Sequence, residues 1–479
     1  MKPSIHRSLN KGRLILLCCL TLAACVTSSR VNGQEAVAHA PVPLANKPLM
    51  GWNSFDSYGV YLYQEAAMAN LEAFAEKLAP HGYEYFIIDA GWFGEFKLKE
   101  GTIYPAEKHA ENMNFNKYGL LLPSHTYFPQ GLQPIIDRCH ALGLKFGVHL
   151  MRGIPREAVR LNLPIKGTSL HAQDIADTTS ICTWCAQNYG VDMSRQGSRE
   201  FYNSVINHLA AWGVDFIKYD DITQYPREIE AVENAIAQCG RPIVLSLSAG
   251  KPSTKSNLPV YRRANLLRVT ADIWDTQSSI DQTFEAWRKW NGENRPGFWI
   301  DMDMIPFGQL LKMSPKPKTT AANEDNQESA IVAFAGKGYN RQSNFTKDQM
   351  LTFITQRALS ASPLMMGGDL PTLDQFSLEL ITNFDMLECN QNGVMGRLVY
   401  ESKGIEIWLT PEQGTADGWI GIFNRSNKLN ASAFSVKDLG LDPANSYTFK
   451  DIWNKSIFVP ADRYEIGPNG VIFLKYLKQ

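Results

Sequence analysis

Short apolar runs recur along the chain from about residue 48, and each run ends in polar residues. Most runs are followed by a stretch in which apolar residues return at helical spacing, as in residues 63–78. Continuously apolar runs are typical of parallel strands that are covered on both faces. We predict eight such strands, at residues 49–55, 85–89, 144–150, 214–220, 242–247, 266–270, 297–300 and 359–366. Their number and their alternation with helices predict a (β/α)8 TIM barrel.

The pattern changes after about Gly393. Five short strand-like runs follow, separated by Gly, Asn, Asp and Pro, and no helix-length pattern lies between them. This texture predicts an antiparallel β-sandwich domain at the C-terminus. We therefore assign residues 45–390 to the (β/α)8 barrel and residues 391–479 to a C-terminal antiparallel β-domain.

The N-terminus has the features of an export signal. An apolar run at residues 14–24, too short to span a bilayer, follows a start that contains only basic charges, on Lys2, Arg7, Lys11 and Arg13. The run ends in Leu22-Ala-Ala-Cys25, which resembles the lipobox of bacterial lipoproteins. The resemblance implies a signal peptide at residues 1–25, a linker at 26–44, and a lipid on Cys25 that holds the chain to a membrane.

The expected location is therefore outside the cytoplasm, as a periplasmic or outer-membrane/cell-surface lipoprotein of a bacterium. The alternative is a plain secretory signal in which Cys25 is incidental.

The composition is that of a globular protein with more than one domain. The 479 residues are 44% hydrophobic and 20% charged, and this length exceeds what one hydrophobic core usually supports. Lys and Arg total 47 against 48 Asp and Glu, so there is no basic surface for nucleic acid. The 11 Trp residues suit a site that stacks on sugars, although most of them should be core residues.

The cysteines do not form a disulfide scaffold. Three of the eight, Cys18, Cys19 and Cys25, fall in the signal, which leaves an odd and scattered set. Cys182-Thr-Trp-Cys185 is a single CxxC motif without a second pair, so a zinc site is not expected. A disulfide and two packed thiols both remain open for this pair.

Polar residues gather at the ends of the predicted strands, where TIM barrels place their active sites. Carboxylates from several strands meeting at one mouth suggest a polyhydroxylated ligand, and two of them could serve as the nucleophile and the acid/base of a glycosidase. Any one of them could instead cap a helix, and Asp301, Asp303 and Asp89 could be metal ligands. No known metal-binding loop surrounds these three, so we expect no metal. The strand-end residues are Asp89, Trp92, His149, Arg152, Lys218, Asp220, Asp221, Arg268, Asp272, Asp301, Asp303 and Asp369.

Five motifs occur in order at barrel spacing. They are Met50-Gly-Trp-Asn-Ser-Phe55, Ile88-Asp-Ala-Gly-Trp92, Ile217-Lys-Tyr-Asp220, Arg268-Val-Thr-Ala-Asp-Ile-Trp-Asp275 and Asp301-Met-Asp-Met304. In this order they resemble glycoside hydrolase family 27, the α-galactosidase family, from about residue 45 to the C-terminus. The resemblance implies a retaining α-glycosidase that needs no cofactor.

The resemblance also implies roles for individual residues. Asp220 matches the nucleophile of the family and Asp272 matches the acid/base. Lys218 fits a hydroxyl donor whose charge should keep Asp220 ionised. The positions that match the sugar-binding residues are Phe55, Asp89, Trp92, His149, Lys218, Arg268, Asp303 and Met304.

Two departures from the family concern the sugar. Ala90 follows Asp89 where the family usually has a second aspartate on the O4 and O6 side, and Ala249 stands where a glutamate often reaches O2. The leading hypothesis is an α-galactosidase that acts on oligosaccharides or glycoconjugates. The alternatives are the same mechanism on a β-L-arabinopyranoside or an isomaltose-type α-glucan, and a non-catalytic glycan-binding lipoprotein. The presence of both Asp220 and Asp272 argues against the last.

Overall fold

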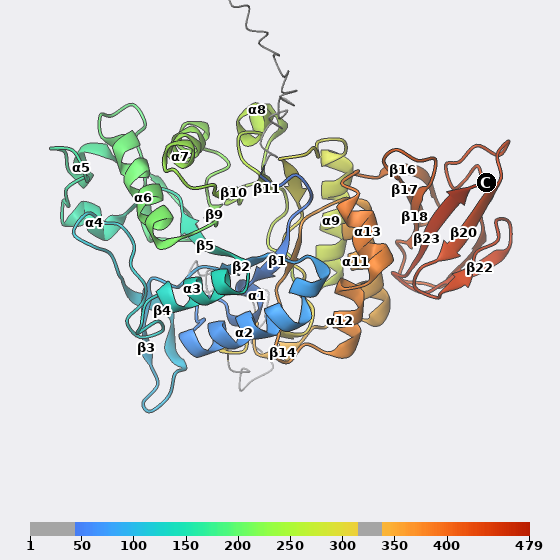
Figure 1. Ribbon diagram of the computed structural model, residues 1–479, viewed down its shortest axis with the longest axis horizontal. Helices are drawn as coiled ribbons and strands as arrows, with labels where there is room; N and C mark the ends of the chain where they lie inside the picture. The colour runs from blue at the N-terminus through green and yellow to red at the C-terminus, as the bar shows by residue number, and fades with distance from the viewer. Residues whose placement is uncertain (1–43, 315–337) are drawn as a thin grey trace, which may run out of the picture. The chain divides into compact units, whose positions relative to one another are not determined.

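The computed structural model describes residues 44–314 and 338–479, which belong to one compact unit (Figure 1). The predicted signal peptide, Cys25 and all but the last residue of the predicted linker lie outside these ranges. Within them, none of the helices has the length and apolar character needed to cross a bilayer.

The central sheet contains eight parallel strands whose spatial order follows the sequence. The backbone of Ile305, just after the last but one strand, exchanges hydrogen bonds with Met365 and Gly367, at 2.8 and 3.0 Å, and closes the sheet. All eight predicted strands are present, so the predicted TIM barrel is confirmed. The strands are β1 (Met50–Asn53), β2 (Tyr85–Ile88), β5 (Lys145–Met151), β9 (Phe216–Asp220), β10 (Val244–Leu247), β11 (Leu266–Arg268), β12 (Trp299–Asp301) and β15 (Leu364–Met366).

Most strands are fully buried, because helices cover the outside of the barrel and side chains fill its interior. Local sequence sets the helix ends. Thr346 and Gln349 form a reciprocal capping box at the start of α11, and Gly213 ends α6 in the left-handed conformation with φ 95°. The principal helices are α2 (Gln64–Lys77), α3 (Gln133–Ala141), α6 (Ser198–Trp212), α7 (Pro226–Gln238), α8 (Leu258–Tyr261), α9 (Gln277–Trp290) and α11 (Lys347–Leu359), with the short α1 (Phe55–Tyr58) after β1.

Two insertions that lie between the predicted barrel strands contain further strands. A hairpin of β3 (Gly94–Leu98) and β4 (Pro105–Met113) follows β2. After β5 comes a small sheet in the order β6-β8-β7, together with two short helices. Strands β3, β4 and β7 carry exposed or partly exposed polar residues and lack an apolar period, and β6 and β8 are only two and four residues long, so the hydrophobic pattern did not reveal them. Their bounds are β6 (Ile154–Pro155), α4 (Arg156–Arg160), α5 (Ala172–Ile175), β7 (Ala176–Ile181) and β8 (Asn188–Val191).

The C-terminal part is antiparallel, as predicted. It contains a six-stranded sheet in the order β16-β17-β18-β23-β20-β21 and a two-stranded sheet of β19 and β22, with a small apolar core of its own. Trp408 of this part stacks on Trp287 of α9 with ring centroids 3.7 Å apart. Strands β19, β21 and β22 are not among the five predicted runs, because they are only two to four residues long. Helices α12 (Gln375–Ile381) and α13 (Phe384–Gln391) precede this part. Its strands are β16 (Arg397–Ser402), β17 (Ile405–Pro411), β18 (Gly418–Asn424), β19 (Asn430–Ala433), β20 (Tyr447–Asp451), β21 (Ser456–Ile457), β22 (Arg463–Ile466) and β23 (Val471–Lys478).

Candidate active site

A pocket of about 200 Å³ opens at the carboxyl ends of the barrel strands. This volume holds roughly ten or more water molecules, which is comparable with the size of one sugar ring. The strand order brings together residues that are far apart in the sequence. The lining residues are Phe55, Asp89, Ala90, Trp184, Lys218, Asp220, Ala249, Gly250, Arg268, Ala271, Asp272 and Met304.

Asp220 ends strand β9 and is buried in the wall of this pocket. Its Oδ2 lies 2.9 Å from Nε2 of His149, whereas its Oδ1 has no hydrogen-bond partner. Burial acts to raise the pKa of Asp220, but Lys218 and His149 outweigh burial and hold the pKa well below its usual range. Asp220 is therefore an ionised carboxylate with one oxygen that no hydrogen bond engages, which suits a nucleophile.

Asp89 and Lys218 form a buried ion pair beside Asp220. Lys218 Nζ lies 2.8 Å from Asp89 Oδ2, which also accepts a hydrogen bond of 2.6 Å from Asn53. Burial opposes ionisation of both groups, but the charge of Lys218 lowers the pKa of Asp89, and Asp89 together with Asp220 raises the pKa of Lys218. The pair is charged and fixed, so it presents a directed donor and acceptor to a sugar hydroxyl.

Asp272 stands on the same pocket and is held by Arg268. Nη1 of Arg268 lies 2.7 Å from Asp272 Oδ1 and 3.2 Å from Asp303 Oδ2. The side chain of Asp272 is 43% exposed, whereas that of Asp220 is 11% exposed. This difference suits two distinct tasks, because an acid/base must exchange protons with water and a nucleophile need not.

Three of the eight expected sugar-binding residues lie behind the pocket wall. His149 reaches the pocket only through Asp220, and Trp92 donates its Nε1 hydrogen to the backbone oxygen of His149 at 2.9 Å. Asp303 is buried and contacts Arg268 and the backbone N–H of Ile273. The structure therefore groups Phe55, Asp89, Lys218, Arg268 and Met304 with Asp220 and Asp272 around the pocket, and sets Trp92, His149 and Asp303 behind it.

A family-27 β-L-arabinopyranosidase from Geobacillus stearothermophilus has a similar structure, with a TM-score of 0.78. It is 35% identical in sequence, and the match covers 90% of this chain and 96% of that enzyme. This chain belongs to glycoside hydrolase family 27. It is therefore an enzyme that hydrolyses glycosidic bonds.

More distant family-27 relatives are α-galactosidases. Alpha-galactosidase 2 of Arabidopsis thaliana is 23% identical over 425 residues, 87% of this chain and 85% of that protein. Alpha-galactosidase A of Cellvibrio japonicus is 25% identical over 405 residues, 82% of this chain and 80% of that protein. No protein-family model matches the sequence.

One aromatic residue of this family-27 pocket is not among the predicted strand-end residues. Trp184 lies between β7 and β8 and lines the pocket together with Asp220 and Asp272. In the sequence it belongs to the CxxC motif, whose Cys182 and Cys185 are free and buried. Only the fold of the insertion brings Trp184 to the barrel mouth, so no spacing in the sequence could have found it.

A buried acid next to the pocket, Asp56, is also not among the predicted strand-end residues. Neither carboxylate oxygen of Asp56, in α1, has a hydrogen-bond partner. Burial, reinforced by the negative charges of Asp303 and Asp272, raises the pKa of Asp56 well above its usual value. Asp56 is therefore harder to ionise than an exposed aspartate.

The alternative of a metal site gains no support from the part of the chain that the structure describes. There, no group of three or more His, Cys, Asp or Glu residues is arranged to hold a metal ion. Asp89 pairs with Lys218 and Asp303 pairs with Arg268, so each of these two carboxylates already has a positively charged side chain as its partner.

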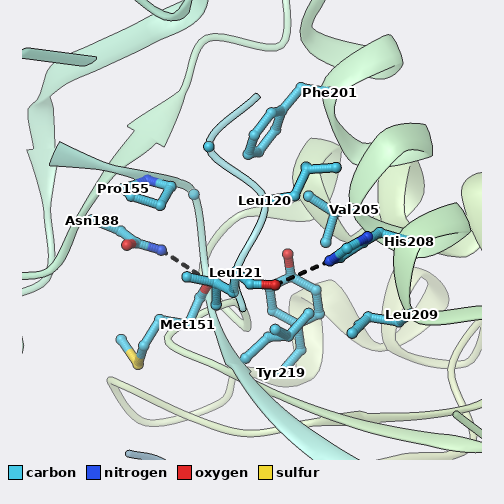
Figure 2. A pocket seen from close by; sticks show the side chains of 13 residues that line it. Leu120, Leu121, Met151, Pro155, Asn188, Phe201, Val205, His208, Leu209 and Tyr219 are labelled. Atoms are coloured by element: carbon cyan, nitrogen blue, oxygen red, sulfur yellow. Dashed lines mark hydrogen bonds between the residues drawn. The ribbon is translucent and has the colours of Figure 1, made fainter. Parts of the chain in front are cut away.

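A second pocket, of about 30 Å³, lies between α6 and strands β5 and β9 (Figure 2). Its walls are mainly apolar and no carboxylate lines it. The His208 ring forms a hydrogen bond of 3.0 Å with the backbone oxygen of Leu121. The side-chain amide nitrogen of Asn188 donates a hydrogen bond of 3.2 Å to the backbone oxygen of Met151. This pocket has none of the groups that glycoside hydrolysis requires.

Proposed function

We propose that this family-27 enzyme is a retaining glycosidase in which Asp220 is the nucleophile and Asp272 is the acid/base. The observation that carries the proposal is that the unpartnered oxygen of Asp220 belongs to an ionised, buried carboxylate on the same pocket as the more exposed Asp272. The pairing of Asp220 with His149 and its charge interaction with Lys218 hold the nucleophile in place without occupying that oxygen.

The reaction then proceeds in two displacements. Asp220 attacks the anomeric carbon while the protonated Asp272 gives its proton to the glycosidic oxygen, so the bond to the leaving group breaks as a glycosyl ester forms. Asp272, now ionised, takes a proton from water, and the resulting oxygen attacks the same carbon and releases Asp220. Two inversions restore the original anomeric configuration.

For the sugar, we propose a terminal residue with the ring configuration of galactose, as in an α-D-galactoside. The α-galactosidases of Arabidopsis thaliana and Cellvibrio japonicus support this choice. One observation favours a β-L-arabinopyranoside as the second candidate. This sugar has the same ring configuration but lacks the hydroxymethyl group on C5, and Ala90 offers no hydrogen bond to such a group. The Geobacillus relative acts on this sugar, and a variant of it binds arabinose in a crystal structure.

Replacing Ala90 with aspartate tests this assignment. The new carboxylate should bind O6 of galactose, and a hydrogen bond to a charged group typically contributes about 1.5–3 kcal/mol. We therefore expect the ratio of kcat/KM for p-nitrophenyl α-D-galactoside over p-nitrophenyl β-L-arabinopyranoside to rise about tenfold to a hundredfold in Ala90→Asp. The same two kcat/KM values in the wild-type enzyme show which of the two candidate sugars it prefers.

Ala249→Asp is the matched control, because it also adds a carboxylate to the pocket but on the expected O2 side, and both sugars carry O2. The ratio should stay within about twofold in this variant. An unchanged ratio in Ala90→Asp, or an equal change in Ala249→Asp, would contradict the placement of Ala90 beside O6. Turnover of an α-glucoside alone would reject both sugars.

We also propose that the enzyme is exported and carries a lipid on Cys25, at the periplasmic face or on the outer membrane or cell surface of a bacterium. The sequence Leu22-Ala-Ala-Cys25 after a basic and apolar start supports this location. In bacterial cells supplied with labelled palmitate, the wild-type protein should become labelled and pellet with membranes. Cys25→Ala should remain unlabelled, and an unlabelled wild-type protein would refute the lipid anchor.

A further inference from the structure

Trp184 reaches the sugar pocket from an insertion and not from a strand end. It lies on the loop of residues 182–187 that joins β7 to β8. Its neighbours Cys182 and Cys185 are buried, Thr183 between them is exposed, and Trp184 itself is partly exposed on the pocket. The two thiols thus anchor the loop in the protein, and the indole is left to line the pocket.

The segment after β10 leaves its own part of the pocket wall without large side chains. Ala249 and Gly250 line the pocket there. A Cβ atom on Gly250 would lie 2.1 Å from Oδ1 of Asp221, far inside van der Waals contact, so any larger residue there would require Asp221 to move. The aromatic surface of the pocket must therefore come from other segments, and Trp184 supplies part of it.

The base of the loop is tied to the end of strand β5. Strand β8 pairs with β6 through Ile154↔Tyr189 and Pro155↔Asn188. The amide nitrogen of Asn188 donates to the backbone oxygens of Met151 and Arg152, at 3.2 and 3.1 Å. The hairpin that carries Trp184 is thus fixed to the barrel through β8.

Arg152, whose backbone oxygen accepts this hydrogen bond from Asn188, also holds the backbone beside the proposed nucleophile through its side chain. Arg152 is buried, and its Nε donates to the backbone oxygen of Asp221, the residue after Asp220, at 3.1 Å. Its Nη1 pairs with Glu228 at 2.9 Å, and its guanidinium group stacks on Tyr225 at 3.5 Å. The base of the hairpin and the segment that follows Asp220 are therefore both bound to Arg152.

We propose that Trp184 is a sugar-binding residue whose indole ring stacks on the apolar C–H face of the sugar held beside Asp220. The inference rests on the proposed function and adds a contact that the strand-end motifs do not include. A flat aromatic ring buries apolar area against the ring hydrogens of a pyranose and requires no ordering of a flexible side chain. Because the stacked ring contacts the sugar before and during the reaction, its loss should weaken binding more than it slows the chemical step.

The test measures inhibition by the free monosaccharides D-galactose and L-arabinose. In Trp184→Ala we expect Ki for the monosaccharide that inhibits the wild-type enzyme better to rise about tenfold or more, with KM rising in parallel and kcat changing less than about threefold. Trp184→Phe keeps an aromatic ring and should retain part of the affinity, and it also serves if the alanine variant does not fold. Thr183→Ala, an exposed neighbour on the same loop, should behave like the wild-type enzyme.

Unchanged Ki values in Trp184→Ala would overturn the inference, and so would an equal rise in Thr183→Ala, which would indicate a general disturbance of the loop. Different results would contradict the proposed glycosidase function and the proposed role of Trp184. A wild-type enzyme that hydrolyses neither aryl glycoside counts against the proposed function. A wild-type enzyme that hydrolyses one of them, with the same Ki as Trp184→Ala, counts against the role of Trp184 alone.

Discussion

Asp220→Ala is expected to lose activity towards aryl glycosides by about 10⁴-fold or more in kcat, because the glycosyl ester can no longer form. The fold should persist, since Asp220 lies at the end of β9 and the barrel core does not depend on its side chain. Steady-state hydrolysis of p-nitrophenyl α-D-galactoside and β-L-arabinopyranoside measures the loss, and thermal unfolding checks the fold.

Added azide provides the control for Asp220→Ala. The anion fits the space left by the carboxylate and can attack the anomeric carbon from the same side, so turnover should recover and yield a glycosyl azide of inverted configuration. Recovery with retained configuration would place the nucleophile elsewhere. Activity close to that of the wild-type enzyme without azide would refute the role of Asp220.

Asp272→Ala is expected to affect substrates according to their leaving groups. Loss of general acid catalysis typically lowers rates by about 10²–10⁴-fold, and the loss falls on leaving groups that need a proton. Hydrolysis of an oligosaccharide should therefore fall by about 10³-fold or more, whereas formation of the glycosyl-enzyme from a dinitrophenyl glycoside, which leaves as a stable anion, should fall far less.

Azide should also distinguish Asp272 from Asp220. In Asp272→Ala it replaces water in the second step without needing a base, so the glycosyl azide should keep the configuration of the substrate. An equal loss on both kinds of leaving group would contradict the acid/base role. Asp281→Ala, at a partly exposed aspartate on α9 that pairs with Arg425, is a control outside the pocket and should change neither rate.

The barrel could be predicted because its strands are short, buried on both faces and separated by helices. Burial on both faces produces continuous apolar runs, such as Tyr85–Ile88, that the sequence displays directly. The insertions could not be predicted in the same way. Strand β7 carries polar and partly exposed residues, so no apolar period marks it as a strand.

In the candidate site too, the sequence predicts the position of some residues, whereas the position of others depends on packing. Lys218 and Asp220 are two residues apart on one strand, so the sequence alone places them on one face at the barrel mouth. His149 also lies near the carboxyl end of a barrel strand, β5, but its distance from the pocket depends on packing, and the structure sets it behind Asp220. Trp184 reaches the pocket only because the hairpin is bound to the end of β5, and that contact has no signal in the sequence.

The most direct test of the mechanism is to trap the covalent intermediate. A 2-deoxy-2-fluoro glycosyl fluoride of the preferred sugar should form the glycosyl-enzyme faster than it is hydrolysed. Digestion and mass spectrometry should then find one fluorosugar on the peptide that contains Asp220, and none in Asp220→Ala. A label on a different carboxylate, or a first product of inverted configuration by NMR, would contradict the account.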